Sequence, residues 1–291
     1  MKFVFIEAEK ATFSITAMCR VLEVSRSGFF AWRRRPASTR SREDVKLTVE
    51  ISAIYQRSRG TYGSPRIHAE LRERSFDVGR RRIARIMRER GLVARPPRRT
   101  RRTTESDDRL PIATNVLERC FDVDQPNRVW VTDITYVRTW QGWLYLAVVI
   151  DLFARRVVGW AMADHLRTEL VLDALAMAIG RRMPDAGLVH HSDRGCQYAS
   201  EAYRTVLDRH GVVCSMSRKG NCCDNAVVES FISTLKTELV HRHAWPTRAA
   251  AQTAISEWIE VFYNHHRRHS SLGYISPARY ETINQHAAHA A

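Results

Sequence analysis

The strongest constraint on the fold is a series of three strand-like segments that begins after Pro126. The segments RVWVTDITYV, WLYLAVVIDLF and RRVVGWAM are rich in Val, Ile, Trp and Tyr, which favour β-strands. Trp140, Gln141 and Gly142 form a turn between the first two, so antiparallel hairpins are expected. The later pattern predicts a helix over 167–182, a strand at LVHHSD, a helix over 200–210, a strand at GVVCSM and a helix over 225–240. Strands followed by alternation with helices predict an α/β fold, in which a mixed five-stranded sheet is flanked by helices.

Three carboxylates occupy positions that such a sheet can bring together. Asp133 is in the first strand, Asp193 follows the fourth strand, and Glu229 is in the helix after the fifth. If the first and fourth strands are neighbours in the middle of the sheet, the two aspartates come close, and a flanking helix can present Glu229 to them. Carboxylates at one point repel one another, and Mg²⁺ or Mn²⁺ relieves that repulsion. Taken singly each residue is ordinary, but the combination predicts a divalent metal site.

The first 110 residues are strongly basic. They contain 27 Lys or Arg against 13 Asp or Glu, whereas residues 111–291 contain 19 against 18, and the whole chain has a net charge of +15. An excess of this size favours a polyanion as partner, so we expect a part that grips nucleic acid, joined to a nearly neutral part with another task. A basic surface that is only solvated is the alternative.

Two helical units are expected within this basic part. Residues 14–35 predict a helix, a tight turn and a second helix that Ser25 or Ser27 caps. In the second unit, Pro65 can begin one helix, while Val78 and Gly79 lead into another that Gly91 ends. Ile83, Ile86 and Met87 face inward on that last helix. The predicted DNA contacts are Arg33, Arg34 and Arg35 in the first unit and Arg80, Arg81, Arg82, Arg85 and Arg88 in the second. Short helical hairpins without DNA, and a solvated Arg-rich face, are the alternatives.

Several other classes of protein and site fit poorly. The apolar runs are far shorter than the roughly 20 residues of a membrane span, and the acidic residues of MKFVFIEAEK do not suit a signal peptide. The six cysteines are irregularly spaced, so no disulfide framework is indicated, and we expect a cytoplasmic protein without membrane contact. A zinc site is disfavoured because Cys222 and Cys223 are adjacent, although the candidate ligands also include His190, His191, Cys196 and Asp224. Asp151 is a possible fourth carboxylate, but a structural role is favoured.

Four strings in the chain resemble a known family. WVTDITYV, HHSDRGCQY, GNCCDNAVVESFISTLKTE and YNHHRRHSSLGYISP are similar to motifs of the DDE transposases and retroviral-type integrases, and 35 residues separate Asp193 from Glu229, as in that family. The closest resemblance is to the OrfB catalytic protein of the IS3 class of bacterial insertion sequences. It implies an α/β ribonuclease-H-like core preceded by all-α helix-turn-helix units. Unlike the retroviral relatives, the chain has no His and Cys zinc module at its N-terminus.

The resemblance also implies roles for individual residues. Asp133, Asp193 and Glu229 would form the metal-binding catalytic triad, with two Mg²⁺ or Mn²⁺ ions. Lys236 is seven residues after Glu229, or two helical turns, and matches a family position that contacts the DNA end. Asn225 and Gln197 would shape the site or touch DNA, although a purely structural role is equally open. We expect Arg267 and Arg268 to contact phosphates.

The sequence therefore predicts a metal-dependent transposase that cleaves DNA and joins strands through a 3′-hydroxyl. The expected parts are a helix-turn-helix-like unit over 1–40, a second over 41–95, a linker over 96–125, the catalytic core over 126–281 and a tail over 282–291. DNA, a homo-oligomer that holds two DNA ends, and an upstream OrfA protein, separate or fused, are the expected partners. The rivals are a nuclease that never joins strands and a DNA-binding regulator with an inactive core.

Overall fold

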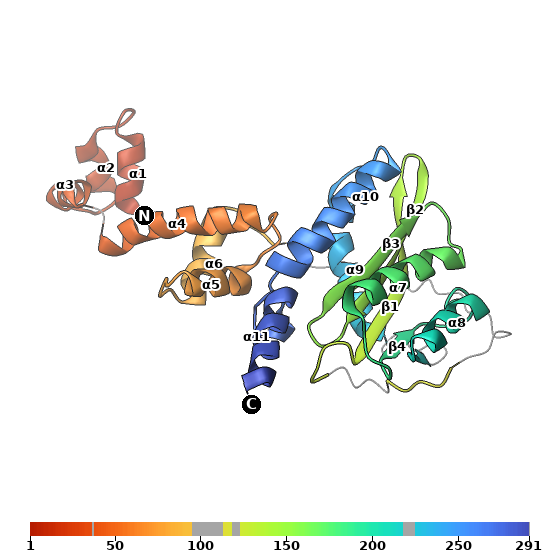
Figure 1. The fold of residues 1–291 in the computed structure, drawn as a ribbon. Coiled ribbons are helices and arrows are strands. Elements are labelled where there is room, and N and C mark those ends of the chain that lie inside the picture. The colour runs from red at the N-terminus through yellow and green to blue at the C-terminus, as the bar shows by residue number, and fades with distance from the viewer. Residues whose placement is uncertain (37, 95–112, 118–122, 218–224, 291) are drawn as a thin grey trace.

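A computed structural model describes residues 1–36, 38–94, 113–117, 123–217 and 225–290, with the side chains of 286–290 left aside (Figure 1). The strands are β1 (Val129–Thr139), β2 (Gly142–Asp151), β3 (Arg156–Ala163), β4 (Val189–Ser192) and β5 (Val213–Met216). The helices before the sheet are α1 (Lys2–Glu9), α2 (Ile15–Val21), α3 (Arg26–Arg34), α4 (Thr39–Arg57), α5 (Ser64–Glu73) and α6 (Arg80–Glu89). Those that follow are α7 (Thr168–Arg182), α8 (Glu201–Arg209), α9 (Ala226–Glu238), η2 (Val240–Arg242), α10 (Arg248–Glu257), η3 (Trp258–His266), η4 (Ser270–Leu272) and α11 (Pro277–Ala290).

The five strands form one mixed sheet in the order β3-β2-β1-β4-β5. β1, β2 and β3 are paired antiparallel, as the sequence predicts, whereas β4 is parallel to both β1 and β5. The first and fourth strands are therefore neighbours in the middle of the sheet, which is the condition under which Asp133 and Asp193 come close. The predicted α/β class with a five-stranded mixed sheet is confirmed.

Alternating side chains of the central strands feed two hydrophobic cores. Ala147 and Val149 of β2 face a core with α7 and α8, while Leu146 and Val148 face a core with α9, α10 and η3. Successive side chains of a strand point to opposite faces, so a strand buried on both sides is apolar throughout. The uninterrupted apolar run in β2 is thus explained by helices that cover both faces of the sheet (Figure 1).

Helices α1, α2 and α3 have a small core of their own. Ile6, Met18 and Phe29 are buried together in it, apart from the two cores of the sheet. Of the two predicted caps, Ser25 begins α3, because its hydroxyl accepts the N–H of Gly28. Figure 1 shows this unit at the end of the molecule away from the sheet, with α4 leading back from it.

Helices α4, α5 and α6 share one of the two hydrophobic cores of the sheet. Buried Ile83, Ile86 and Met87 face inward, as predicted, and belong to the cluster that includes residues of α9 and η3. The Tyr62 hydroxyl accepts the backbone N–H of Arg268 at 2.8 Å, which joins the segment before α5 to the chain after η3. The second helical unit is therefore attached to the sheet through buried side chains.

Two helices cross boundaries predicted from the sequence. α4 passes through the boundary between 40 and 41, and α11 passes through the one between 281 and 282. The predicted linker over 96–125 lies largely outside the described residues. In the described part of the chain, no helix is long and apolar enough to cross a membrane.

Candidate active site

The parallel pairing of β1 with β4 brings Asp133 and Asp193 to one end of the sheet. Val129, Trp130 and Val131 pair with Val189, His190 and His191. Asp133 and Asp193 each lie two residues beyond the last of these pairs, on strands that run about 4.8 Å apart. Oδ1 of Asp133 accepts the N–H of Ile134 at 2.7 Å, and Oδ1 of Asp193 accepts the N–H of Gly195 at 2.9 Å.

The electrostatic environment of Asp133 reveals which charges surround it. Burial, helped by the charges of Asp193 and Glu229, raises the pKa of Asp133 to about 8, while the Ile134 N–H and Lys236 oppose the rise. Burial also raises the pKa of Asp193, against the hydrogen bond from Gly195. The structure thus brings Asp133, Asp193, Glu229 and Lys236 within electrostatic range of one another.

Helix α9 carries both Glu229 and Lys236. Val228, Phe231 and Leu235 are buried at helical spacing, so the opposite positions of α9 are left to polar side chains. The ammonium of Lys236 lies 4.8 Å from the centre of the Tyr136 ring on β1. Burial lowers the pKa of Lys236, whereas the neighbouring Asp133 raises it.

The donor atoms near Asp133 suit a hard divalent cation. Within the described residues, no three His, Cys, Asp or Glu side chains are grouped closely enough to hold a metal ion, and Glu229 is exposed. Asn225 adds an oxygen, because its Nδ2 donates to the carbonyl of Thr132 at 3.0 Å while its buried Oδ1 has no hydrogen-bond partner among the residues that the structure describes. Carboxylate and amide oxygens are the ligands that Mg²⁺ and Mn²⁺ prefer, so these residues fit the predicted ion.

The loop after Asp193 is held by contacts that sequence reasoning missed. Buried Gln197 donates through Nε2 to the carbonyl of Leu166 at 3.0 Å, so its amide nitrogen has a structural partner. A Cβ at Gly195 would lie 3.0 Å from Oδ1 of Asp193 and 3.1 Å from Oε1 of Gln197. Glycine at this position therefore leaves room for both side chains. The glycine between Asp193 and Gln197 in the DRGCQ string could have indicated this close approach.

His190, His191 and Asp151 have structural partners inside the protein. Nε2 of His190 lies 3.0 Å from the Tyr203 hydroxyl, and burial, helped by His191, lowers the pKa of His190 to about 3. The ring of His191 contacts the hydroxyls of Ser215 and Ser217 at 2.9 and 3.0 Å. Asp151 is fully buried and accepts the N–H groups of Asn127 and Phe153. Of the other residues of the disfavoured zinc site, Cys196 is exposed, and Cys222, Cys223 and Asp224 lie outside the described residues.

Comparison with known proteins identifies the family. The family described as Integrase core domain matches residues 123–222 and 210–277, and the family described as HTH-like domain matches residues 41–100. Over 286 residues the chain is 43% identical to the Transposase InsF for insertion sequence IS3A of Escherichia coli (strain K12), with 98% of this chain and 99% of that protein covered. The chain belongs to the IS3-family transposases. The resemblance and the transposase function predicted from the sequence are thereby confirmed.

Two further comparisons concern a protein of another insertion element and a solved integrase structure. The transposase is 46% identical over 272 residues to the Insertion element IS600 uncharacterized 31 kDa protein of Shigella sonnei, with 93% of this chain and 100% of that protein covered. The structure of the HTLV-2 integrase catalytic core domain in complex with magnesium covers 54% of this chain and 97% of that chain, at 16% identity and a TM-score of 0.42.

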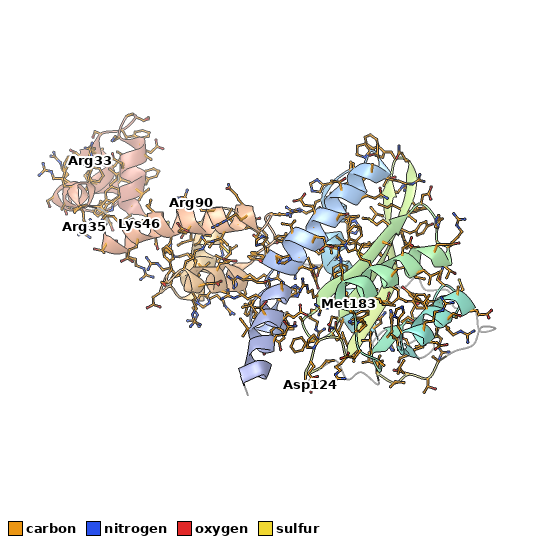
Figure 2. All side chains as sticks on the ribbon, viewed as in Figure 1. Arg33, Arg35, Lys46, Arg90, Asp124 and Met183 are labelled. Atoms are coloured by element: carbon orange, nitrogen blue, oxygen red, sulfur yellow. The ribbon has the colours of Figure 1, made fainter. Side chains whose placement is uncertain are left out.

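The predicted DNA contacts of the transposase divide into exposed and internally paired arginines. Arg82 pairs with Glu43 and Asp44, and Arg85 pairs with Asp44 and Glu89, so these two hold α6 against α4. The exposed residues are Arg33, Arg34, Arg35, Arg80, Arg81 and Arg88. Figure 2 labels Arg33 and Arg35 on the unit farthest from the sheet. Nε of Arg33 also lies 3.5 Å from Oε2 of Glu7.

The structure argues against the predicted phosphate contacts at Arg267 and Arg268. Arg267 is buried and donates through Nε and Nη2 to the two carboxylate oxygens of Glu238, at 2.9 and 2.8 Å. Arg268 is also buried and donates to Glu70 at 2.8 Å, to Glu73 and to the Tyr274 carbonyl. Arg267 thus links the chain after η3 to α9, and Arg268 links it to α5. Because their donors are engaged inside the protein, both residues are no longer candidates for DNA contact.

Proposed function

We propose that Asp133, Asp193 and Glu229 bind Mg²⁺ or Mn²⁺, and that the transposase uses this site to cleave DNA and to join a 3′-hydroxyl to another strand. The observation that carries the proposal is the position of the partly buried Asp133 beside Asp193, with Glu229 and Lys236 in electrostatic range. A buried acid whose neighbours are also acids needs positive charge to ionise. Two bound cations would activate the attacking oxygen and stabilise the leaving oxygen of the phosphodiester.

The protein's own groups would position the DNA. Lys236 projects beside Asp133 and would hold a phosphate of the DNA end near the carboxylates. Gly195 and Gln197 fix the loop that carries Asp193, and Asn225 ties the start of α9 to β1 next to Asp133. Such positioning favours in-line attack on the phosphorus, and no covalent link between protein and DNA is required.

The basic helical units would bind the DNA backbone. Their exposed arginines, defined above, suit phosphates, which supply affinity and register rather than direct reading of sequence. We further propose that the protein works on DNA in the cytoplasm, that a dimer or larger assembly holds two DNA ends, and that an OrfA protein contributes recognition of the element ends.

The proposal is tested with a labelled element end, an unlabelled target DNA and Mg²⁺. Asp133→Asn, Asp193→Asn and Glu229→Gln each remove a charge with little change of shape. We expect each to reduce both cleavage and joining to background, while gel-shift affinity for the same DNA remains. Asp173→Asn, on the exposed surface of α7, is the matched control and should keep full activity.

Two outcomes would contradict the proposal. Undiminished joining by Asp133→Asn would remove the metal-site assignment. Cut ends that are never joined, in any divalent cation, would indicate a nuclease in place of a strand-transferring enzyme.

A further inference from the structure

A groove of about 590 Å³ lies beside the candidate active site. One wall is the end of the β1–β2 hairpin, and the other is the chain that follows α9. The groove is lined by Tyr136, Arg138, Thr139, Trp140, Trp143, Lys236, Val240, His241, His243, Ala244 and Trp245. Lys236 belongs to both places, because it lines this aromatic groove and interacts with Asp133. A strand that leaves the active site past Lys236 would therefore enter the groove.

The walls of the aromatic groove are held by hydrogen bonds. β1 pairs with β4 only as far as Val131, so the hairpin extends beyond the five-stranded part of the sheet. At the turn, the Trp140 N–H donates to the Trp245 carbonyl at 3.0 Å, and the Trp245 indole N–H donates to the Val240 carbonyl at 3.1 Å. The groove is consequently formed before any ligand arrives, which lowers the entropic cost of binding.

Three aromatic side chains of the groove are exposed, whereas Trp245 is buried in the core beneath them. Trp140 is 77% exposed, Trp143 is 45% exposed and Tyr136 is 40% exposed. Tyr136 and Arg138 alternate along β1 with buried Val137 and Thr139, so the exposed pair shares one face of the strand. Rings left in water on a hydrogen-bonded hairpin indicate a surface that another molecule covers.

The charge of the groove selects the kind of molecule. Arg138 and Lys236 line it, and none of its described lining residues is acidic. Flat rings combined with cations match the bases and phosphates of nucleic acid. Bases in a duplex are already stacked on their neighbours, so only unpaired bases can offer their faces to indole rings.

We propose that this aromatic groove binds the unpaired nucleotides of the DNA strand that enters the active site. The bases stack on Trp140 and Trp143, while Lys236 and Arg138 contact the phosphates. The inference rests on the proposed function in that the strand bound here is the one that is cut or joined at Asp133.

The test measures DNA affinity of the full-length protein in EDTA, so that no strand is cut. Two probes share one sequence, a blunt duplex and a duplex with three unpaired end nucleotides that include the fluorescent base 2-aminopurine. Wild type should bind the unpaired end more tightly and quench its fluorescence, as stacking does. Trp140→Ala should weaken binding to this probe by about 5-fold or more, the loss of one base stack, and restore its fluorescence. Affinity for the blunt duplex should stay within about twofold, as expected when phosphate contacts alone remain.

Two further variants and a sedimentation measurement show whether base stacking causes the loss of affinity. Trp140→Phe retains a ring and should recover most of the affinity, whereas Trp143→Ala should behave like Trp140→Ala. An equal loss on both probes, or no loss on either, would overturn the inference. Altered sedimentation of the protein with unchanged DNA affinity would mark the groove as a contact between copies of the chain and would overturn it as well.

The groove and the chemistry can fail separately. If wild type shows the preference and Trp140→Ala loses it, but Mg²⁺ yields neither cleavage nor joining, the groove stands and the proposed function fails. If wild type joins DNA while the Trp variants bind both probes as wild type does, only the groove inference fails.

Discussion

Replacing Asp133 by Asn should make the transposase more stable and inactive at the same time. Burial among acidic neighbours raises the pKa of Asp133 to about 8, whereas an Asp in an unfolded chain ionises near pH 3.9. Between these values the unfolded state loses its proton and the folded state keeps it, so the contribution of Asp133 to stability falls as pH rises. At pH 7 the two pKa values imply a cost of about 4 kcal/mol, from about three units at 1.36 kcal/mol each. Asn cannot ionise, yet its oxygen can still accept the Ile134 N–H, so the variant avoids this cost.

The assay is urea denaturation of wild type, Asp133→Asn and the control Asp173→Asn, in EDTA, from pH 5 to pH 8. We expect the free energy of unfolding of Asp133→Asn to exceed that of wild type by a margin that grows by about 1.4 kcal/mol per pH unit. Mg²⁺ should reduce this difference in the free energy of unfolding, because the cation stabilises folded wild type, whereas the variant lacks the Asp133 carboxylate that would bind it. Asp173→Asn should follow wild type throughout. If Asp133→Asn is no more stable than wild type at pH 7, the reasoning from burial and neighbouring charge is refuted.

Three further perturbations test the packing and the DNA contacts. Glu238→Gln leaves the Arg267 guanidinium buried without its counter-charge, so chemical denaturation should register a loss of about 3–5 kcal/mol, and a loss below 1 kcal/mol would contradict the buried pair. At Gly159 a new Cβ would lie 2.3 Å from a backbone carbonyl of α7, so thermal denaturation should show Gly159→Ala destabilised by about 1–3 kcal/mol. A Cβ at Gly180 would meet open space, so Gly180→Ala should be stabilised by up to about 1 kcal/mol in the same assay. Arg88→Ala should weaken binding to all DNA sequences alike and reduce the slope of log affinity against log salt by about 1, and a sequence-dependent loss would indicate base reading instead.

The sheet and the position of the aspartates follow from local patterns in the sequence. Apolar runs of strand length, with turns between them, restrict the arrangement of β1, β2 and β3, and the strand-helix alternation that follows requires parallel pairing. Once β4 lies beside β1, the positions of Asp133 and Asp193 along their strands are sufficient to bring them to one end of the sheet. The neighbouring positions of Asp133 and Asp193 were therefore predictable from the sequence, whereas their union with Glu229 in a metal-binding triad stays a proposal.

Helix α4 has a recognisable pattern in the sequence, whereas the ion pairs of the buried arginines do not. Leu47, Ile51 and Ile54 recur at helical spacing in α4, so that helix could have been found by the same periodicity that predicts α6. The partners of Arg268 could not, because Glu70 lies 198 residues away in the sequence. From the local sequence alone, Arg268 in its polar segment is expected to be an exposed cation, because its carboxylate partners are distant in the sequence. Long-range burial, rather than local propensity, thus decides which basic residues remain available to DNA.

Helix α9 connects the candidate active site to the basic helical units through its two ends. Glu229 lies in its first turn, and Glu238 is its last residue, about 14 Å farther along at 1.5 Å per residue. Glu238 is held by Arg267, and the next residue, Arg268, is held by Glu70 of α5 and by Tyr62. Because these contacts are buried and α9 is continuous, a shift of α5 relative to the sheet must either break an ion pair or move α9. The two adjacent arginines therefore join α5 to the end of the helix whose first turn carries Glu229.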